Sequence, residues 1–226
     1  MGGAWRIAAH EWRLVLKEPR FLFPFLFTPL VLLGLQALSL WAMRGPERES
    51  LELARSLLLT LAVLAPGSAV PLGADSFAGE RERNTLEILM CLPAGLGALF
   101  WGKILGMIPF PILLGWMGQV LLGVLLAGRG YWSPEFGIMQ AKAMALTPAT
   151  SLFLCSLAAW LSMVAESVRG AAQLASLAML GMFLLASVFA PAYFHSAGAM
   201  AGSLVFLLAA SAACFLAARR RFPKAL

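Results

Sequence analysis

Two short stretches of the sequence have residue types and spacings that suggest chemistry. Residues 97–103 (GALFWGK) match the G-x-x-x-x-G-K spacing of a phosphate-binding loop, but Ile104 stands where such a loop needs Ser or Thr for magnesium. His10 and Glu11 begin like the zinc motif H-E-x-x-H, but Leu14 stands where the second histidine would be. The sequence therefore predicts that this chain has no metal site and no ATPase activity of its own.

Three polar residues in largely apolar surroundings allow further interpretations. Ser68 follows a Pro-Gly pair, and together with His195 it would suggest an intramembrane serine protease, although no spacing ties the two residues together. Asp75 lies near the end of an apolar stretch, where a carboxylate is costly unless it is paired or reaches water. We interpret Asp75 either as the ion-pair partner of a nearby arginine or as a gating residue coupled to protons or cations.

The densest group of charged and helix-capping residues lies between two apolar segments, in residues 74–103. Four charges of alternating sign come first, a suitable helix N-cap follows, and apolar residues then recur on one face until a proline ends the helix. A short amphipathic helix between membrane spans indicates a docking element for a soluble partner. The residues assigned to docking are Glu80, Arg81, Glu82, Arg83, Thr85, Leu86, Glu87, Leu89, Met90 and Pro93.

The composition decides the class of protein that must position these residues. Of the 226 residues, 61% are hydrophobic and only 12% are charged, whereas soluble domains carry about 25% charged residues. Long apolar runs with so little charge indicate an integral membrane protein built as one transmembrane domain over residues 1–226. The net charge of +6 comes from basic residues at the ends of the apolar runs, which argues against a nucleic-acid partner.

The apolar runs predict an all-α fold with six transmembrane helices. Residues 4–18 place aromatic residues on one face and cations on the other, which predicts a helix lying in the membrane interface. Residues 80–97 are predicted to form a cytoplasmic coupling loop between the second and third spans. The six spans are expected at about residues 21–43, 56–77, 102–127, 138–165, 171–191 and 200–218. Kinks or hinges are expected at Pro66, Gly67 and Pro71 in the second span and at Pro109 and Pro111 in the third.

The basic residues also predict an orientation in the membrane. Six spans put both termini on one side, and that side would carry twelve of the Lys and Arg residues against five on the other. An excess of positive charge marks the cytoplasmic side. We therefore expect a multi-pass protein of the cytoplasmic (inner) membrane with both termini in the cytoplasm.

One run of residues resembles a known family signature. Residues 75–87 (DSFAGERERNTLE), followed by Leu89, Pro93 and Gly102-Lys103, resemble the signature of ABC-2-type transporter permeases. In that family the pattern reads roughly D-S-x-A-G-E-[KR]-E-R-x-T-L-E, then Pro, then G-K at the start of the third span. Asn84 departs from the pattern, where Gly is common. The short first external loop makes sodium-exporter-like members of the family a poorer fit.

The resemblance implies the permease subunit of an ATP-binding-cassette exporter working by alternating access. It implies a separate ATPase subunit docked at about residues 85–92, with ATP and magnesium bound by that partner and no cofactor bound by this chain. It also implies a second permease copy, identical or related, with membrane lipids around both. The alternatives left open are a haem-exporter-like permease of cytochrome c maturation and a non-ABC membrane enzyme or scaffold.

Overall fold

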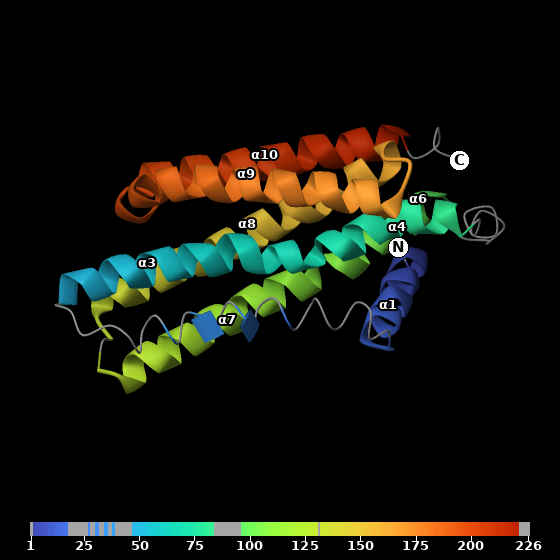
Figure 1. Cartoon of the computed structure of the whole chain (residues 1–226). Coiled ribbons are helices and arrows are strands. Elements are labelled where there is room, and N and C mark those ends of the chain that lie inside the picture. Colours follow the sequence, from blue (N-terminus) through green and yellow to red (C-terminus); the bar gives the residue numbers. More distant parts are fainter. Residues whose placement is uncertain are drawn as a thin grey trace.

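The structure, a computed structural model, describes residues 2–17, 47–83, 96–130 and 132–221, together with residues 27, 30, 31, 34, 35 and 38. Every element in the four long ranges is a helix, which confirms the predicted all-α fold (Figure 1). The first expected span, residues 21–43, lies almost entirely outside the described residues. So do six of the residues assigned to docking, namely Thr85, Leu86, Glu87, Leu89, Met90 and Pro93.

Five helices of the described part are long and apolar enough to cross a membrane: Glu52–Glu82, Gly97–Gly128, Pro134–Val164, Val168–His195 and Ala197–Arg221. They overlie the second to sixth expected spans, and nearly all of their ends extend beyond the predicted limits. The extension has a simple cause: about 20 apolar residues cross the hydrocarbon layer, and a helix can continue into the interface with charged residues on it. Helices accordingly extend into both ends of the loop predicted at 80–97.

The second and third spans are both interrupted at prolines. In the second, α3 (Glu47–Leu64) passes into a 3-10 turn, η1 (Ala65–Ala69), and then into α4 (Val70–Glu82). In the third, α6 (Leu96–Met107) and α7 (Pro109–Gly128) are separated at Ile108. Pro66 and Pro109 each lack the amide hydrogen that would continue the ladder. Pro71 and Pro111 lie in the first turns of α4 and α7, and bending at any of these prolines stays a prediction.

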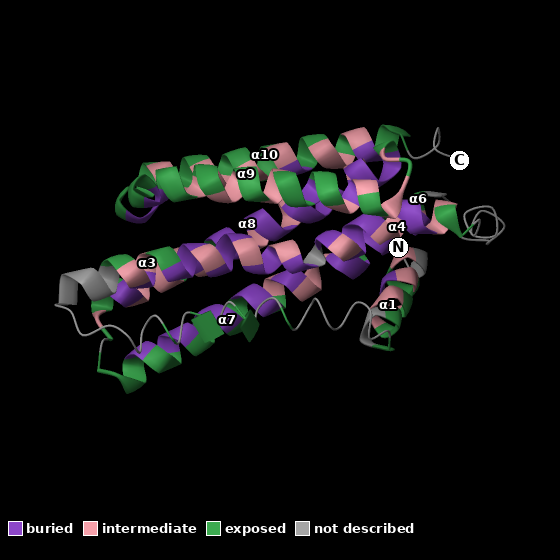
Figure 2. Cartoon of the chain, in the orientation of Figure 1, coloured by how far each residue is buried: buried purple, intermediate pink, exposed green. Residues whose placement is uncertain are grey.

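Helix α8 (Pro134–Val164) lies at the centre of the bundle. It packs against α3, α4 and α7, and also against α9 (Val168–His195) and α10 (Ala197–Arg221). Figure 2 shows the consequence: buried residues dominate α4 and much of α8, whereas α9 and α10 are largely exposed. Because the exposed residues of α9 and α10 are mostly apolar, these two helices present a surface suited to lipid.

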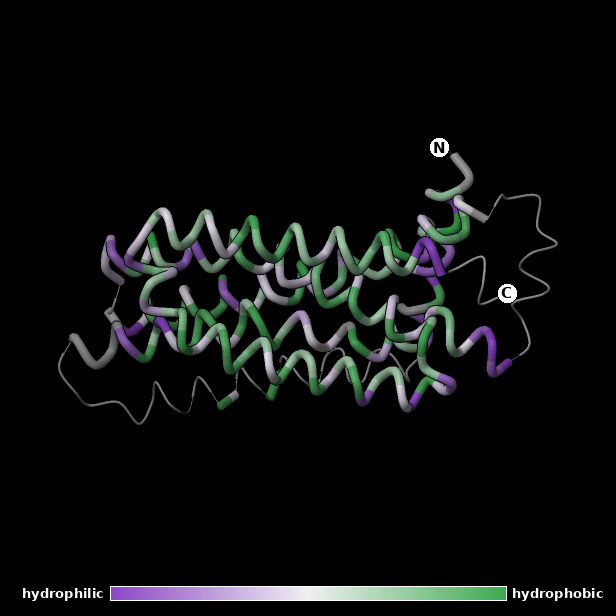
Figure 3. Tube along the Cα trace, turned by 90° about the horizontal axis from the view of Figure 1, so that it is seen from above, coloured by the Kyte–Doolittle hydropathy of each residue, from purple (hydrophilic) through white to green (hydrophobic). Residues whose placement is uncertain are grey.

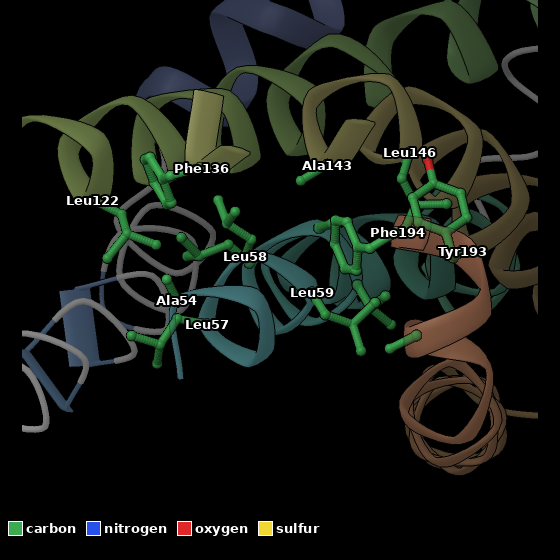
Figure 4. Packing of buried hydrophobic residues seen from close by; sticks show 14 of the residues in the cluster. Ala54, Leu57, Leu58, Leu59, Leu122, Phe136, Ala143, Leu146, Tyr193 and Phe194 are labelled. Carbon is green, nitrogen blue, oxygen red and sulfur yellow. The ribbon is translucent and has the colours of Figure 1, made fainter. Parts of the chain in front are cut away.

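The buried residues form two main clusters at different depths. One joins α3, α7, α8 and the end of α9 around residues such as Leu58, Phe136 and Phe194. Figure 4 shows Leu58 between Phe136 and Phe194, which lie toward opposite sides of the view. The other joins α4, α6 and α8 around Phe77 and Phe100, whose ring centroids lie 5.9 Å apart. The second cluster adjoins the end of the bundle that carries α1 (Gly2–Lys17), which we call the α1 end. Hydrophilic residues gather at both ends of the bundle, and apolar residues line the length between them (Figure 3).

Candidate functional site

Helix α1 is attached to the bundle through two glycines of α6. A Cβ added to Gly102 would lie 2.6 Å from Ile7 Cβ, and one added to Gly106 would lie 2.9 Å from Glu11 Cβ. These distances are too short for any larger residue, so the G-x-x-x-G spacing allows the two backbones to approach closely. Figure 1 shows α1 steeply inclined to the other helices, at the end of the bundle. That orientation is what the amphipathic pattern of residues 4–18 predicts for a helix in the membrane interface.

Lys103, next to Gly102, is the centre of a buried ion cluster. Its side chain is only 5% exposed, and its Nζ donates to Glu11 Oε1 of α1 and to Glu80 Oε1 of α4, at 3.2 Å each. A buried ammonium is tolerated only when carboxylates compensate its charge. The Lys103 cluster therefore ties together α1, α4 and α6, three elements that are distant in sequence.

The other three charges of the run 80–83 also contact this chain. Arg81 donates from its guanidinium to the carbonyl oxygen of Ala165, and Glu82 Oε1 accepts from the backbone amide of Val168 at 2.8 Å. Ala165 and Val168 flank the turn between α8 and α9. Glu80, Arg81 and Glu82 thus lie on the last turn of α4 and fasten it to the neighbouring helices, and Arg83 follows directly after the helix. The predicted role of the charge run in docking a partner is not tested by these contacts.

Asp75 lies one to two helical turns before the charge run and pairs with its last member. Arg83 Nη2 donates to Asp75 Oδ1 at 2.9 Å and to Oδ2 at 3.2 Å, and the Asp75 side chain is 19% exposed. This is the ion pair that the first interpretation of Asp75 requires. The gating interpretation stays a prediction.

These groups surround a pocket of about 90 Å³ between α1, α4 and α6. Its charged lining mixes both signs, and the remaining lining residues are Ser76 and apolar or glycine residues. The charged residues are Glu11, Asp75, Glu80, Arg83 and Lys103. The carboxylates already pair with the two cations, and within the described residues no group of three or more His, Cys, Asp or Glu side chains is arranged to hold a metal ion. The arrangement is suited to holding helices together.

A serine of α8 joins α4 at the same end of the bundle, and the sequence analysis did not single it out. Ser162 Oγ donates to the carbonyl oxygen of Ala74 at 2.8 Å and accepts from the amide of Ala78, also at 2.8 Å. It therefore stands between two backbone groups that would otherwise pair within α4. One turn away, a Cβ on Gly73 would lie 2.5 Å from Ala158 Cβ. The signal in the sequence is the small residues Ala158 and Ser162, four positions apart on one face of α8.

Polar residues also converge in the middle of the bundle. Gln119 is fully buried, and its Nε2 donates to Thr147 Oγ1 at 2.8 Å. Gln140 Nε2 donates to the carbonyl oxygen of Gln119, and Thr150 Oγ1 donates to that of Ala62 at 2.6 Å. This polar network contains amides and hydroxyls without a carboxylate, imidazole or thiol. It is therefore suited to fixing α7, α8 and α3 together.

Two further patterns noted in the sequence, the motif at residues 97–103 and the pair Ser68 and His195, do not form sites in the structure. Residues 97–103 lie on helix α6, whereas a phosphate-binding loop is a loop between a strand and a helix. Ser68 donates to the carbonyl oxygen of Ala65 at 2.7 Å, and His195 Nε2 lies 3.4 Å from Arg55 Nη1. Ser68 and Arg55 are 13 residues apart along the second span, about 20 Å at helical rise. The structure does not bring Ser68 and His195 together as a protease pair.

The fold and these contacts define a class: a multi-pass helical membrane protein whose charged end binds the amphipathic helix α1 and carries the connection between α4 and α6. Among curated proteins, no match to the chain is found. Residues 5–210 match the family described as ABC-2 family transporter protein. Because this match covers most of the chain, the protein belongs to the ABC-2 transporter family, and it is the membrane permease of an ABC transporter.

Proposed function

We propose that this permease exports its substrate by alternating access, driven by a separate ATP-binding subunit that docks at about residues 85–92, within the segment 84–95. The observation that supports the proposal is the Lys103 cluster, which links the helix leading into that segment (α4) to the helix leading out of it (α6) and to α1. A push on the segment would be passed to all three helices at once. The breaks at η1 and at Ile108 provide places where the spans can bend.

The contacts divide the residues assigned to docking into two groups with different expected roles. Each charge of residues 80–83 contacts its own chain, so we assign this group to transmission. The segment beginning at Thr85, with Leu86, Glu87, Leu89 and Met90, is assigned to contact with the ATP-binding subunit. Under this assignment ATP and magnesium belong to the partner, and two permease copies form the complete pathway.

The orientation proposed for the chain places the α1 end in the cytoplasm. Among the described residues, ten Lys and Arg residues lie at the α1 end and four at the opposite end. An excess of this size is what the positive-inside rule expects of a cytoplasmic face. Residues 84–95 would then be accessible to a cytoplasmic ATP-binding subunit, in an inner membrane.

The proposal is tested by measuring ATPase activity and substrate-dependent transport of the reconstituted complex. Glu87→Ala is expected to weaken binding of the ATP-binding subunit, whereas Glu80→Ala is expected to leave binding intact but to lower transport for each ATP hydrolysed. Both variants should insert normally in the membrane. Glu135→Ala, at the opposite end of the bundle, is the matched control and should change neither property. Normal binding and normal coupling in both test variants would overturn the assignment.

A further inference from the structure

Helix α1 has a face that the bundle does not use. Its contact with α6 runs through Ile7, the fully buried Ala8 and Glu11. At 100° per residue, Arg6, Arg13 and Lys17 fall within about 40° of one another, on the side of α1 turned away from α6. All three side chains are exposed. We call Arg6, Arg13 and Lys17 the basic face of α1.

The charge of this face is not balanced by the part of the chain that the structure describes. Within residues 2–17, Glu11 is the sole acidic residue, and it is engaged by Lys103 on the opposite side of the helix. The ion pairs found among the described residues join other groups. Three cations therefore stand side by side without a carboxylate between them, which favours an anionic binding partner.

Aromatic residues flank the basic face and indicate the surroundings to which it is suited. Trp5 is 59% exposed and stacks edge-on against Trp12, with their ring centroids 5.4 Å apart. The two tryptophans lie between the basic face and the contact with α6. Exposed tryptophans beside basic residues are typical of the headgroup level of a bilayer. The inclination of α1 to the membrane-spanning helices places its length along that level (Figure 1).

We propose that the basic face of α1 binds the headgroups of anionic phospholipids. The phosphate oxygens would accept from Arg6, Arg13 and Lys17, while Trp5 lies among the upper parts of the acyl chains. Each basic residue at an anionic membrane surface strengthens association about fivefold. The inference does not depend on an ATP-binding subunit, so its failure would leave the docking proposal untouched.

The test is lipid competition on the full chain purified in detergent. Equimolar short-chain phosphatidylglycerol and phosphatidylcholine are added, and native mass spectrometry measures the ratio of the two lipids bound. The wild-type chain should prefer phosphatidylglycerol. Replacement of the three cations of the basic face (R6Q, R13Q and K17Q together) should lower that preference about tenfold or more. A charge-preserving variant (R6K, R13K and K17R together) should retain it, which controls for folding.

A matched control removes the same charge from the same end of the bundle. Arg219, Arg220 and Arg221 are exposed at the end of α10, and their replacement by Gln should leave the preference at the wild-type value. An equal loss in both triple variants would overturn the proposal in favour of general surface charge. A wild-type chain without preference would also overturn it. So would a basic-face variant that keeps its lipid preference but loses a co-purifying protein, since the face would then bind a protein.

Discussion

The second span and the last span of this permease are similar in hydropathy and opposite in environment. The most apolar windows of Glu52–Glu82 and Ala197–Arg221 have mean hydropathies of 1.8 and 2.1, yet 71% of the first and 0% of the second are buried. The difference lies in small and polar residues. In α4, Gly73 touches Ala158 and Ser162 bonds to the backbone, whereas a Cβ on Gly202 of α10 would meet nothing within 4 Å.

This comparison teaches that apolar character identifies a span without saying what surrounds it. In a membrane, lipid tails and the protein interior are equally apolar surroundings for a leucine side chain. Close packing and polar contacts therefore decide which helices are buried. The helix that leads into the proposed docking segment is the one whose environment is most fully fixed by the rest of the chain. A helix enclosed in this way can pass a displacement to several neighbours at once.

The largest difference in stability between the two spans is expected when one glycine in each, Gly73 of α4 and Gly202 of α10, is replaced by leucine. Gly73→Leu would place a side chain where Ala158 Cβ lies only 2.5 Å from the position of a new Cβ, and forced separation of α4 and α8 should cost about 3 kcal/mol or more. Gly202→Leu, the matched control on α10, should be tolerated. The yield of monodisperse protein in detergent and its thermal midpoint measure both. Equal midpoints would show that the two spans do not differ in packing as described.

A smaller effect is expected at the Lys103 cluster. Lys103→Met leaves two carboxylates facing each other, and it should cost about 1–3 kcal/mol. That is below the cost of about 3–5 kcal/mol for breaking a fully buried pair, because Glu11 and Glu80 remain 28% and 22% exposed. The triple variant Lys103→Met/Glu11→Gln/Glu80→Gln should recover most of this loss, as measured by the thermal midpoint. A triple variant as unstable as the single one would rule out the charges as the cause.

The smallest effect on stability is expected for a single hydrogen bond between α7 and α8, in the middle of the bundle. A double-mutant cycle with Gln119→Leu and Thr147→Val isolates the hydrogen bond between α7 and α8. Interhelical hydrogen bonds in membranes are worth about 0.6 kcal/mol on average, and we expect a coupling energy of that size from unfolding free energies. Additive effects of the two substitutions would mean that the polar network does not hold these helices together.

The sequence was sufficient for the helical fold, for the location of five spans and for the family. Hydropathy, prolines and the run 75–87 are local signals, and each can be interpreted without knowing which helices are neighbours. The interruption of the second span followed from Pro66 in the same way. Helix ends were less well predicted, because α4 and the other span helices continue past their apolar residues into the interface.

The contacts of the charge run could not be predicted, because they depend on helices far away in sequence. Glu80 and Lys103 belong to the resembling residues, but Glu11, the second partner of Lys103, lies more than 60 residues before Glu80, on α1. Ser162 gave only a weak signal, its spacing of four residues from Ala158, since small residues at this spacing are common in apolar helices. The hydrogen bond between Gln119 and Thr147 likewise depends on α7 and α8 lying side by side.

The central claim, that this permease is driven by a separate subunit docked next to the Lys103 cluster, is tested most directly by affinity purification. The tagged chain is extracted in mild detergent, with residues 84–92 either intact or scrambled and residues 80–83 unchanged in both. The account predicts that an ATP-binding subunit with ATPase activity co-purifies with the intact chain and is lost with the scrambled one. A chain that purifies without any ATPase, or a scrambled chain that retains it, would contradict the account.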